Sequence, residues 1–256
     1  MKLLFLGSGG SMGIPVIGCK CSVCASNSSF NKRLRPSVLI THEKKRYLID
    51  IGPDYRTQAL IHGIDNLDGL LLTHTHYDHI AGLDELRIYT FVQKKPVPCL
   101  LSKETLEELK IRYHYFLPLN GSDSAYATKL KFQVLERDQG KTDFEGLPVA
   151  YISYDQLGMK VNGFSFGSFA YVTDVFNYKE EIFEALQGIE TLIISGRRWE
   201  QSKAHLSLED AIKFSKKTGA KKTYFTHISH EIDHDETNQN LPQGFSLAYD
   251  GLELTL

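Results

Sequence analysis

The stretch of sequence that decides the fold is His74-Thr75-His76-Tyr77-Asp78-His79, which places four metal-binding side chains within six residues. It follows an apolar run at residues 69–73 that predicts a strand. Polar residues at the carboxyl end of an apolar strand are typical of an active-site loop. In extended backbone His74 and His76 point to one side, and a turn after them brings Asp78 and His79 toward the same point. Because imidazole suits zinc, manganese or iron, this stretch predicts a metal centre.

Working outward, short apolar runs bounded by turn residues predict further strands. They lie at 2–6, 38–41, 47–51, 130–135, 147–152, 164–174 with a turn near Gly167, 191–195 and 223–226. Helical spacing predicts helices at 83–92, 103–115, 179–186 and 207–217, the last opened by a capping box of Ser207 and Asp210. Residues 43–45 predict a hairpin turn, and residues 120–127, which are rich in Gly, Ser and Asp, predict a loop.

Composition excludes several classes of protein. The 256 residues carry 29 Lys and Arg against 31 Asp and Glu, a formal charge of −2, which disfavours a nucleic-acid or anionic-membrane partner. With 42% hydrophobic and 23% charged residues the chain is neither disordered nor collagen-like. The run at 1–7 is too short for a signal peptide or membrane span, so we expect a cytoplasmic protein. Without repeats or a Pro/Gly-rich linker, a single domain over 1–256 is expected.

Cysteine usage points to a second metal site. Cys19, Cys21 and Cys24 lie within six residues, a crowding that suits one metal ion better than long disulfide loops. A tetrahedral zinc site needs a fourth ligand, for which His230 is the candidate. A redox or disulfide role is the alternative. Cys99, alone in a hydrophobic run, is expected to be a small buried side chain.

The loop at residues 7–13 does not bind a nucleotide in either familiar way. Met12 stands where G-x-G-x-x-G requires glycine, and no Gly-Lys-Ser/Thr follows. A tight loop beside the active site remains. It is expected either to present backbone amides to a phosphate or to be a plain structural turn.

Several motifs together resemble the metallo-β-lactamase superfamily. Residues 74–79 match its H-x-H-x-D-H signature, and residues 47–52 resemble its strand that ends in D-x-G. Residues 170–174 resemble the strand that supplies a metal-bridging aspartate, and Thr226-His227 resembles the last histidine ligand. The resemblance spans nearly the whole chain. It implies an α/β fold, an αββα sandwich of two mixed sheets flanked by helices.

The resemblance also implies a ligand set for two divalent ions, manganese or zinc, at the active site. One ion would be held by His74, His76 and Asp174, and the other by Asp78, His79, Asp174 and His227. Asp50 would orient the metal loop, as carboxylates behind metal ligands commonly do. Asp78 would also hold or deprotonate the attacking water.

One family ligand is absent. Members normally carry a further histidine on the strand before the bridging aspartate, whereas this chain has none between His114 and His205. Counting back from Gly163-Phe164, the position falls at about Gln156. Gln156 or Asp155 would supply oxygen instead, or water would fill the place. The expected consequence is a single tightly held ion, a different metal, or little activity.

The C-x-C-x-x-C spacing with a remote histidine resembles one branch of the superfamily, the phosphoribosyl cyclic phosphodiesterase of phosphonate breakdown and its relatives. This implies one structural zinc in a cysteine-rich loop at about 18–36. His205 resembles the histidine that the family places near the scissile phosphate, as general acid or oxyanion stabiliser. A helix-cap role is its alternative.

The function implied is a metal-dependent hydrolase acting on a phosphodiester, foremost a small cyclic one. Two alternatives stay open: an RNA-processing nuclease resembling tRNA 3′-processing endonucleases, and a degenerate metal-binding or interaction protein that has lost catalysis with the missing histidine. A homodimer is a further expectation.

Overall fold

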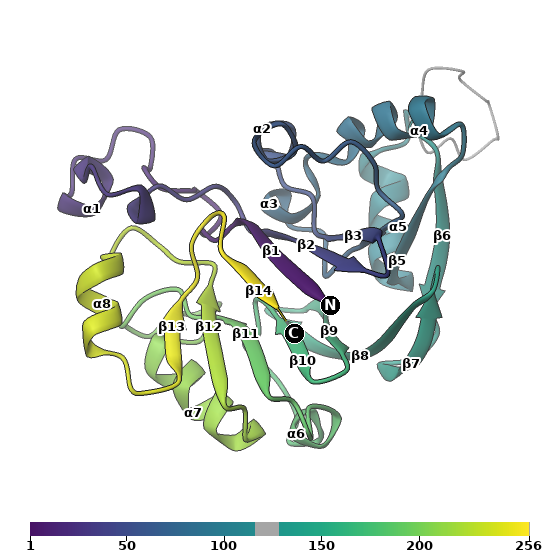
Figure 1. Cartoon of the computed structure of the whole chain (residues 1–256). Coiled ribbons are helices and arrows are strands. Elements are labelled where there is room, and N and C mark those ends of the chain that lie inside the picture. The colour runs from purple at the N-terminus through teal and green to yellow at the C-terminus, as the bar shows by residue number, and fades with distance from the viewer. Residues whose placement is uncertain (116–127, 256) are drawn as a thin grey trace.

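The computed structural model describes residues 1–115 and 128–255, and within them the chain forms two seven-stranded sheets. In order across the first sheet the strands are β14 (Glu253–Thr255), β1 (Lys2–Gly7), β2 (Ser37–His42), β3 (Lys45–Ile49), β4 (Gly69–Leu71), β5 (Val97–Ser102) and β6 (Leu130–Leu135). Across the second they are β13 (Phe245–Leu247), β12 (Lys222–Thr226), β11 (Thr191–Ser195), β10 (Phe169–Val172), β9 (Met159–Phe166), β8 (Leu147–Gln156) and β7 (Gln139–Phe144). The two termini lie side by side because β1 pairs with β14 (Figure 1).

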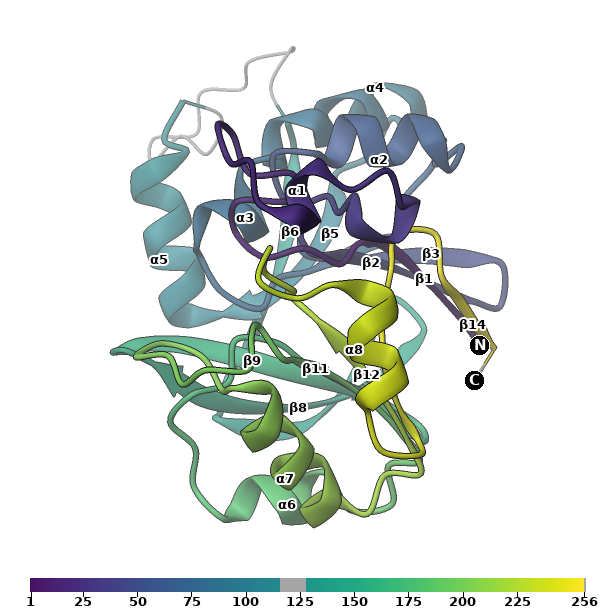
Figure 2. The ribbon, with the colours of Figure 1, turned by 90° about the vertical axis from the view of Figure 1, so that its left-hand side faces the viewer.

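Helices cover the outer face of each sheet, so the molecule has four layers (Figure 2). Over the first sheet lie α2 (Tyr55–Ile61), α3 (Tyr77–Ile80), η2 (Leu83–Leu86), α4 (Arg87–Gln93) and α5 (Lys103–Arg112). On the side of the second sheet lie α6 (Glu181–Ala185), α7 (Leu208–Thr218) and α8 (His234–Asn240), and a loop near α8 carries α1 (Ser22–Ala25) and η1 (Ser29–Asn31). The expected αββα sandwich is confirmed.

The core consists of three apolar layers between these four. The central layer joins the inner faces of the sheets, with Phe5 and Tyr47 from the first against Phe164 and Tyr171 from the second, all fully buried. Removing a side chain of this size from water stabilises the fold by about 1.5–3 kcal/mol. The outer layers bury one face of α7 and of α5 against their sheets. This packing fixes the sheets relative to each other, and so fixes the side chains at their shared edge.

Both sheets are mixed, and their parallel strands matter most for the site. In the first sheet β3 and β4 run parallel, and in the second β10, β11 and β12 do. The carboxyl ends of parallel strands meet at one edge, which is where ligands bind in open α/β sheets. Asp50, Asp174 and His227 follow β3, β10 and β12, and each has a left-handed φ between +53° and +60°. That backbone state is costly for residues other than glycine and clusters at functional sites.

The secondary structure differs from the expectation in places. The helix expected at 83–92 is a 3₁₀ turn, η2, followed by α4, and the helix expected at 103–115 ends at Arg112. Ser207 caps α7 as expected, since its Oγ accepts from the backbone of Asp210, but the Asp210 carboxylate contacts the Ser207 hydroxyl rather than completing the box. The hairpin turn has positive φ at Glu43 and Lys44. The loop expected at 120–127 lies outside the described residues.

Candidate active site

The histidine loop begins where β4 ends and continues into α3. His74 is buried, and its Nε2 lies 3.0 Å from Nδ1 of His76, so the two nitrogens face one point. The other nitrogen of His74, Nδ1, lies 2.9 Å from the hydroxyl of Thr73. His76 stands just before α3, whose first turn contains Asp78. The short helix therefore turns Asp78 and His79 back toward the two preceding histidines.

Asp50 holds this loop from behind, as expected. Its Oδ2 lies 2.7 Å from Nδ1 of His79, and its carboxylate accepts from the backbone and the hydroxyl of Thr73 at 2.9 and 2.8 Å. The D-x-G pattern has a steric reason: a Cβ on Gly52 would lie 2.3 Å from the carbonyl oxygen of Asp78. Only glycine lets the chain after Asp50 pass so close to the metal loop.

The second sheet contributes Asp174 and His227. Oδ2 of Asp174 lies 3.1 Å from Nε2 of His79, and Nε2 of His227 lies 3.2 Å from Oδ2 of Asp78 and 3.5 Å from Oδ1 of Asp174. The backbone N–H of Asp174 donates to Oγ of Ser195, the last residue of β11. Contacts between the two carboxylates and these imidazoles thus cross from one sheet to the other.

These side chains fit divalent metal ions. Ligands about 2.1 Å from one tetrahedral ion lie about 3.4 Å apart, close to the separations above. Ligand atoms within 4.8 Å of one another form the sets His74, His79 and Asp174, and Asp78, His79 and His227. Nε2 of His79 is buried without a hydrogen-bond partner although two carboxylates are near. That arrangement is typical of atoms that share a cation rather than a proton.

The electrostatics favour the same interpretation. Burial alone would raise the pKa of Asp78 and Asp174, but the neighbouring His79 and His227 outweigh it and lower the pKa of both carboxyls. Burial lowers the pKa of His74 well below its ordinary value. The two carboxylates are therefore ionised and His74 is neutral, which are the forms that bind metal. His79 differs: burial alone would lower its pKa, but Asp78 and Asp50 outweigh burial and raise its pKa well above the ordinary value, so an ion would replace a proton there.

The two candidates for the missing ligand are neighbours on β8 and therefore face opposite sides of the strand. Gln156, at the end of β8, is buried, and its Nε2 lies 3.3 Å from Oδ1 of Asp174. The structure does not bring Asp155 to the cluster. Its Oδ1 accepts from Asn177 and from the backbone of Gly158 instead, because successive residues of a strand face opposite sides.

His205 joins the cluster from the segment between β11 and α7. Its Nδ1 lies 2.9 Å from Oδ1 of Asp174, and its ring centroid is 5.2 Å from that of His227. Asp174, His205 and His227 form another set of ligand atoms within 4.8 Å. Ser207, rather than His205, provides the side-chain cap of α7, so the helix-cap role does not apply to His205.

The cysteines and His230 form a separate group, here called the cysteine clamp. Nδ1 of His230 lies 3.3 Å from Sγ of Cys19 and 3.6 Å from Sγ of both Cys21 and Cys24. Zinc with a tetrahedral shell places sulfur and nitrogen about 3.6 Å apart. None of the cysteines is in a disulfide. A hydrogen bond from the backbone of Cys24, together with His230, lowers the pKa of Cys21 to about 6, which favours the thiolate. Cys99, in β5, is buried as expected.

Some supporting residues were not foreseen. Thr73 links Asp50 to His74, Ser195 holds the backbone of Asp174, and Asn162 donates from its backbone and side chain to the carbonyl of Thr73. Thr73 precedes the first ligand and Ser195 ends a predicted strand, so position alone could have suggested those two. Asn162 reaches the site only through the packing of β9.

Two amides of the glycine loop are bonded within the fold, which favours a structural turn at these positions. The amide of Gly9 donates to Leu34 and that of Gly10 to Ile228, at 2.9 and 2.8 Å, so neither is left for a phosphate. Gly9 also forms a parallel bridge with Ile228. The loop thereby supports the backbone that follows His227.

Comparison with known proteins agrees with this geometry. A model of the β-lactamase superfamily domain matches residues 45–228. A crystal structure described as a new diphosphatase from the PhnP family is 36% identical, covers 99% of this chain and 96% of its own, and superposes with a TM-score of 0.90.

Other similar proteins are more distant or longer. An octanoyltransferase of Porphyromonas gingivalis (strain ATCC BAA-308 / W83) is 35% identical over 263 residues, which cover 99% of this chain but 51% of that protein. The chain thus spans about half the length of this curated relative. The short form of human tRNase Z, at 18% identity and a TM-score of 0.68, covers 100% of this chain and 99% of its own and shares the fold. Taken with the metal-binding cluster, the family match and the PhnP-family structure show that this chain belongs to the β-lactamase superfamily and to its PhnP-like branch.

Proposed function

We propose that this chain hydrolyses small phosphodiesters, cyclic ones included, with divalent ions held by His74, His76, Asp78, His79, Asp174 and His227. The observation that carries the proposal is that the ligand atoms of His74, His79, Asp78, Asp174 and His227 form overlapping sets at the edge where the two sheets meet, with His76 beside His74. The similarity over the full chain to a PhnP-family enzyme supports the branch.

Ions bound there would lower the pKa of a water and neutralise charge on the phosphate. The chain's own residues do the rest. Asp78, whose pKa is low, is available to accept a hydrogen bond from the attacking water and so orient it. Arg197 follows β11 in the segment that leads to His205, and its carbonyl accepts from the backbone of Ser229, two residues after His227, at 3.0 Å. Its position on this segment makes it the candidate to attract an anionic substrate.

A second candidate reaction is hydrolysis of a phosphoanhydride. The PhnP-family structure that is 36% identical to this chain is described as a diphosphatase. A phosphodiester and a diphosphate present the same kind of centre, a phosphorus with charged oxygens and a leaving oxygen. They differ in the leaving group. A phosphate leaving group has a pKa near 6 and departs without a proton, whereas an alkoxide is far more basic and needs one.

The nuclease alternative rests on less. The similarity to tRNase Z is one of fold, and the formal charge of −2 gives no excess of cations for RNA. Cleavage of structured RNA with a steep salt dependence would favour it.

The test is a substrate panel on the fully metallated protein. It contains a cyclic nucleotide, a linear dinucleotide phosphodiester, bis(p-nitrophenyl) phosphate, a pyrophosphate-linked dinucleotide and structured RNA. We expect turnover of at least one small diester, abolished by chelator and restored by Mn²⁺ or Zn²⁺. His76→Ala should lower kcat/KM more than a hundredfold, because it removes a ligand rather than a supporting residue.

His114→Ala is the matched control, since it deletes an exposed histidine that lies outside the cluster. It should keep full activity. No turnover of any small substrate by protein that binds its ions would overturn the proposal and favour the non-catalytic alternative.

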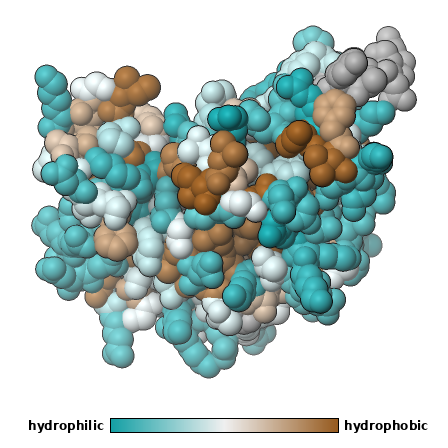
Figure 3. All heavy atoms as spheres, turned by 45° about the horizontal axis from the view of Figure 1, so that its top comes forward, coloured by the Kyte–Doolittle hydropathy of each residue, from teal (hydrophilic) through white to brown (hydrophobic). Residues whose placement is uncertain are grey.

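We also propose a protein partner, a second copy of this chain. No helix in the described part of the chain is both long and apolar enough to cross a membrane. The face in Figure 3 is mostly hydrophilic with separate hydrophobic groups. The exposed apolar residues of α2 and α4 are Leu60, Ile61, Ile88, Phe91 and Val92. We propose that this surface contributes to a homodimer, which light scattering would detect as twice the chain mass.

A further inference from the structure

The position where the family has its missing histidine is filled by a residue that donates hydrogen bonds. Nε2 of Gln156 lies 3.0 Å from the carbonyl oxygen of Ala204 and 3.3 Å from Oδ1 of Asp174. Both neighbours are acceptors, so this end of the amide must be its nitrogen. Turning the amide over would set its oxygen against two other oxygens.

Gln156 is therefore poorly suited to be a metal ligand. An amide binds a metal ion through its oxygen, whereas the end of Gln156 that lies beside Asp174 is Nε2. Oε1 is buried without a hydrogen-bond partner among the described residues, as Nε2 of His79 is, but it is at the other end of the amide. To present Oε1 to an ion beside Asp174, the side chain would have to give up its bond to Ala204. As it stands, Gln156 ties the segment that carries His205 to the strand end of β8.

That tie has a consequence for His205. Ala204 immediately precedes it, and Nε2 of Gln156 also lies 3.3 Å from Nδ1 of His205. His205 is thereby held with Nδ1 at 2.9 Å from Oδ1 of Asp174, beside the His227 ring. The residue is 9% exposed, so His205 is largely buried within the cluster. Its ligand atom lies within 4.8 Å of those of Asp174 and His227.

We propose that His205 is a metal ligand in this chain, sharing Asp174 with His227, and that Gln156 positions it. The imidazole that the family takes from the strand before the aspartate comes here from the segment before α7. This deepens the proposed function and rests on its metal site. The chain keeps the number of nitrogen donors, but the histidine expected to protonate the leaving oxygen is used for binding the ion.

The use of His205 as a metal ligand instead of a general acid determines which substrates the chain prefers. In the reaction the oxygen of water forms a bond to phosphorus, the bond from phosphorus to the leaving oxygen breaks, and that oxygen keeps the electron pair. An alkoxide then needs a proton, whereas a phosphate or a p-nitrophenolate does not need one near pH 7. With His205 bound to metal, the chain should still cleave the small diesters proposed above, but it should turn over aryl diesters and diphosphates, whose leaving groups are acidic, faster than cyclic and other alkyl diesters.

Metal binding tests the proposal without any substrate. Each variant is loaded with Zn²⁺ or Co²⁺, and ions per chain, affinity by calorimetry and the cobalt absorption spectrum are measured. We expect His205→Ala to lose one active-site ion or to weaken its binding at least tenfold, and to change the cobalt spectrum. The cysteine-clamp zinc should remain. If His205 is only a general acid, metal content and spectrum stay unchanged, and that result overturns the proposal.

Substitutions of Gln156 separate positioning from ligation, because the two roles predict opposite signs. Gln156→Glu cannot donate to Ala204, so a positioning role predicts weaker metal binding and a cobalt spectrum shifted toward that of His205→Ala. A ligand role predicts tighter binding by the new carboxylate and would overturn the proposal. Gln156→His in the His205→Ala background should restore the lost ion. His114→Ala is the control, expected to bind metal normally.

Turnover adds an independent arm. If His205 is a ligand, His205→Ala should lose activity equally on p-nitrophenyl and alkyl esters. A loss confined to alkyl esters would show that it protonates the leaving group. Loss of metal from His205→Ala in a protein that hydrolyses nothing would leave this inference standing while the proposed function fails.

Discussion

The catalytic cluster and the cysteine clamp both bring metal-binding side chains together, but the protein holds them in different ways. In the cluster the ligands follow strands and are buried, and His74, His79 and Asp174 each have a supporting partner in Thr73, Asp50 or Ser195. The clamp is built on a loop in which Cys19 and Cys21 are only half-buried and the regular structure is two short turns, α1 and η1. The fold supports the cluster from outside, whereas the clamp ligands mainly contact one another.

This difference suggests what each ion does. A cluster supported by other side chains would keep its geometry without an ion, which fits the proposal that ions bound there serve chemistry. A clamp whose ligands contact one another needs its ion to fold. The two are joined along the chain, because His227 and His230 lie in the same segment after β12.

The largest effect on stability is expected at the clamp. Cys21→Ser should lose the structural zinc and lower the thermal midpoint by roughly 5–10 °C, since structural zinc couples to folding and a few kcal/mol shifts a domain of this size by that amount. Metal analysis and calorimetry would measure both. Cys99→Ala, which removes a thiol outside the clamp, should keep its zinc. A Cys21→Ser protein with normal zinc and an unchanged midpoint would remove the distinction between the two sites.

A smaller effect is expected from the support behind the cluster. Asp50→Asn keeps the size of the side chain but removes the charge that faces His79, so metal affinity or activity should fall about 10–100-fold. Titration with Zn²⁺ after chelation would measure the affinity. Asp65→Asn, at an exposed carboxylate paired with Arg46, should change nothing. Equal Zn²⁺ affinity in wild type and Asp50→Asn would mean that the Asp50 carboxylate does not orient His79 for metal binding.

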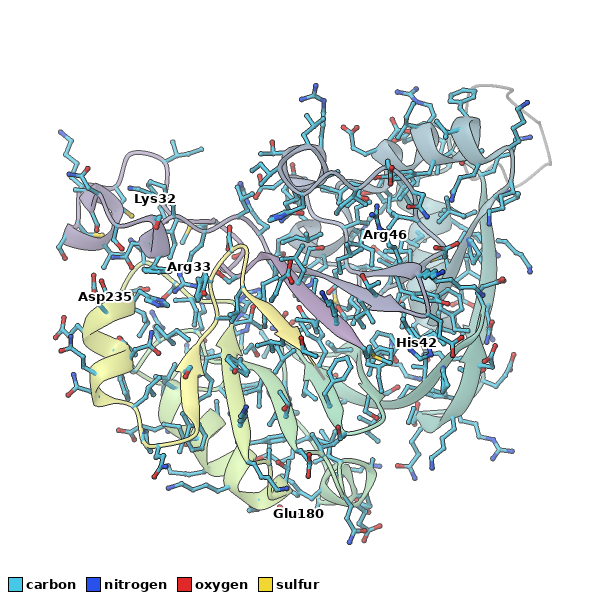
Figure 4. The ribbon with its side chains drawn as sticks, in the orientation of Figure 1. Lys32, Arg33, His42, Arg46, Glu180 and Asp235 are labelled. Atoms are coloured by element: carbon cyan, nitrogen blue, oxygen red, sulfur yellow. The ribbon has the colours of Figure 1, made fainter. Side chains whose placement is uncertain are left out.

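The smallest effect on stability is expected at His234, which follows the clamp residue His230 in the chain. Unlike the clamp ligands, His234 is held by a side chain outside the clamp. Buried Arg33 contacts Nδ1 of His234 at 2.9 Å and the hydroxyl of Ser8 at 2.7 Å, on the same side of the molecule as Asp235 (Figure 4). Burial and then the Arg33 charge lower the pKa of His234 to about 4. The folded protein thus binds this proton less readily than the unfolded chain, whose pKa is near 6.5. Stability should fall as the pH drops from 6.5 toward 4.

Urea unfolding at pH 7 and pH 5 would show this. The loss attributable to His234 should be on the order of 1–2 kcal/mol, less than the full linkage value because pH 5 still lies above the folded pKa of about 4. His234→Gln should have a correspondingly shallower pH dependence than wild type. Identical slopes would mean that the Arg33 network does not hold this segment.

Much of the fold was predictable where the sequence carries a local apolar signal, although the fully buried strand β5 was not predicted. β11 has the expected bounds, and Ser207 caps α7. β7 was missed because it is a polar edge strand whose residues alternate between half-buried and exposed. α8 was missed because its sequence, HDETNQN, has no apolar face and depends on the Asp233 cap. Such elements are determined by tertiary contacts rather than by periodicity.

The site was predictable in its ligands and less so in its supports. The H-x-H-x-D-H stretch is contiguous, and the side chains expected around it lie together. Asp155 was a poor candidate because strand alternation turns it away when Gln156 faces in. The contact of His205 with Asp174 joins residues far apart in sequence, through a segment whose path depends on Gln156. No local pattern contains that information.

The contacts of Asp78 with His227 and of His79 with Asp174 run between the two sheets. An ion bound there acts as a cross-link between the halves of the molecule, and unfolding must release it. At a free metal concentration one hundred times its dissociation constant, each such ion adds about 2.7 kcal/mol to the free energy of unfolding. Melting temperature in chelator and in excess metal is therefore a reporter of the active site that works before any substrate is known.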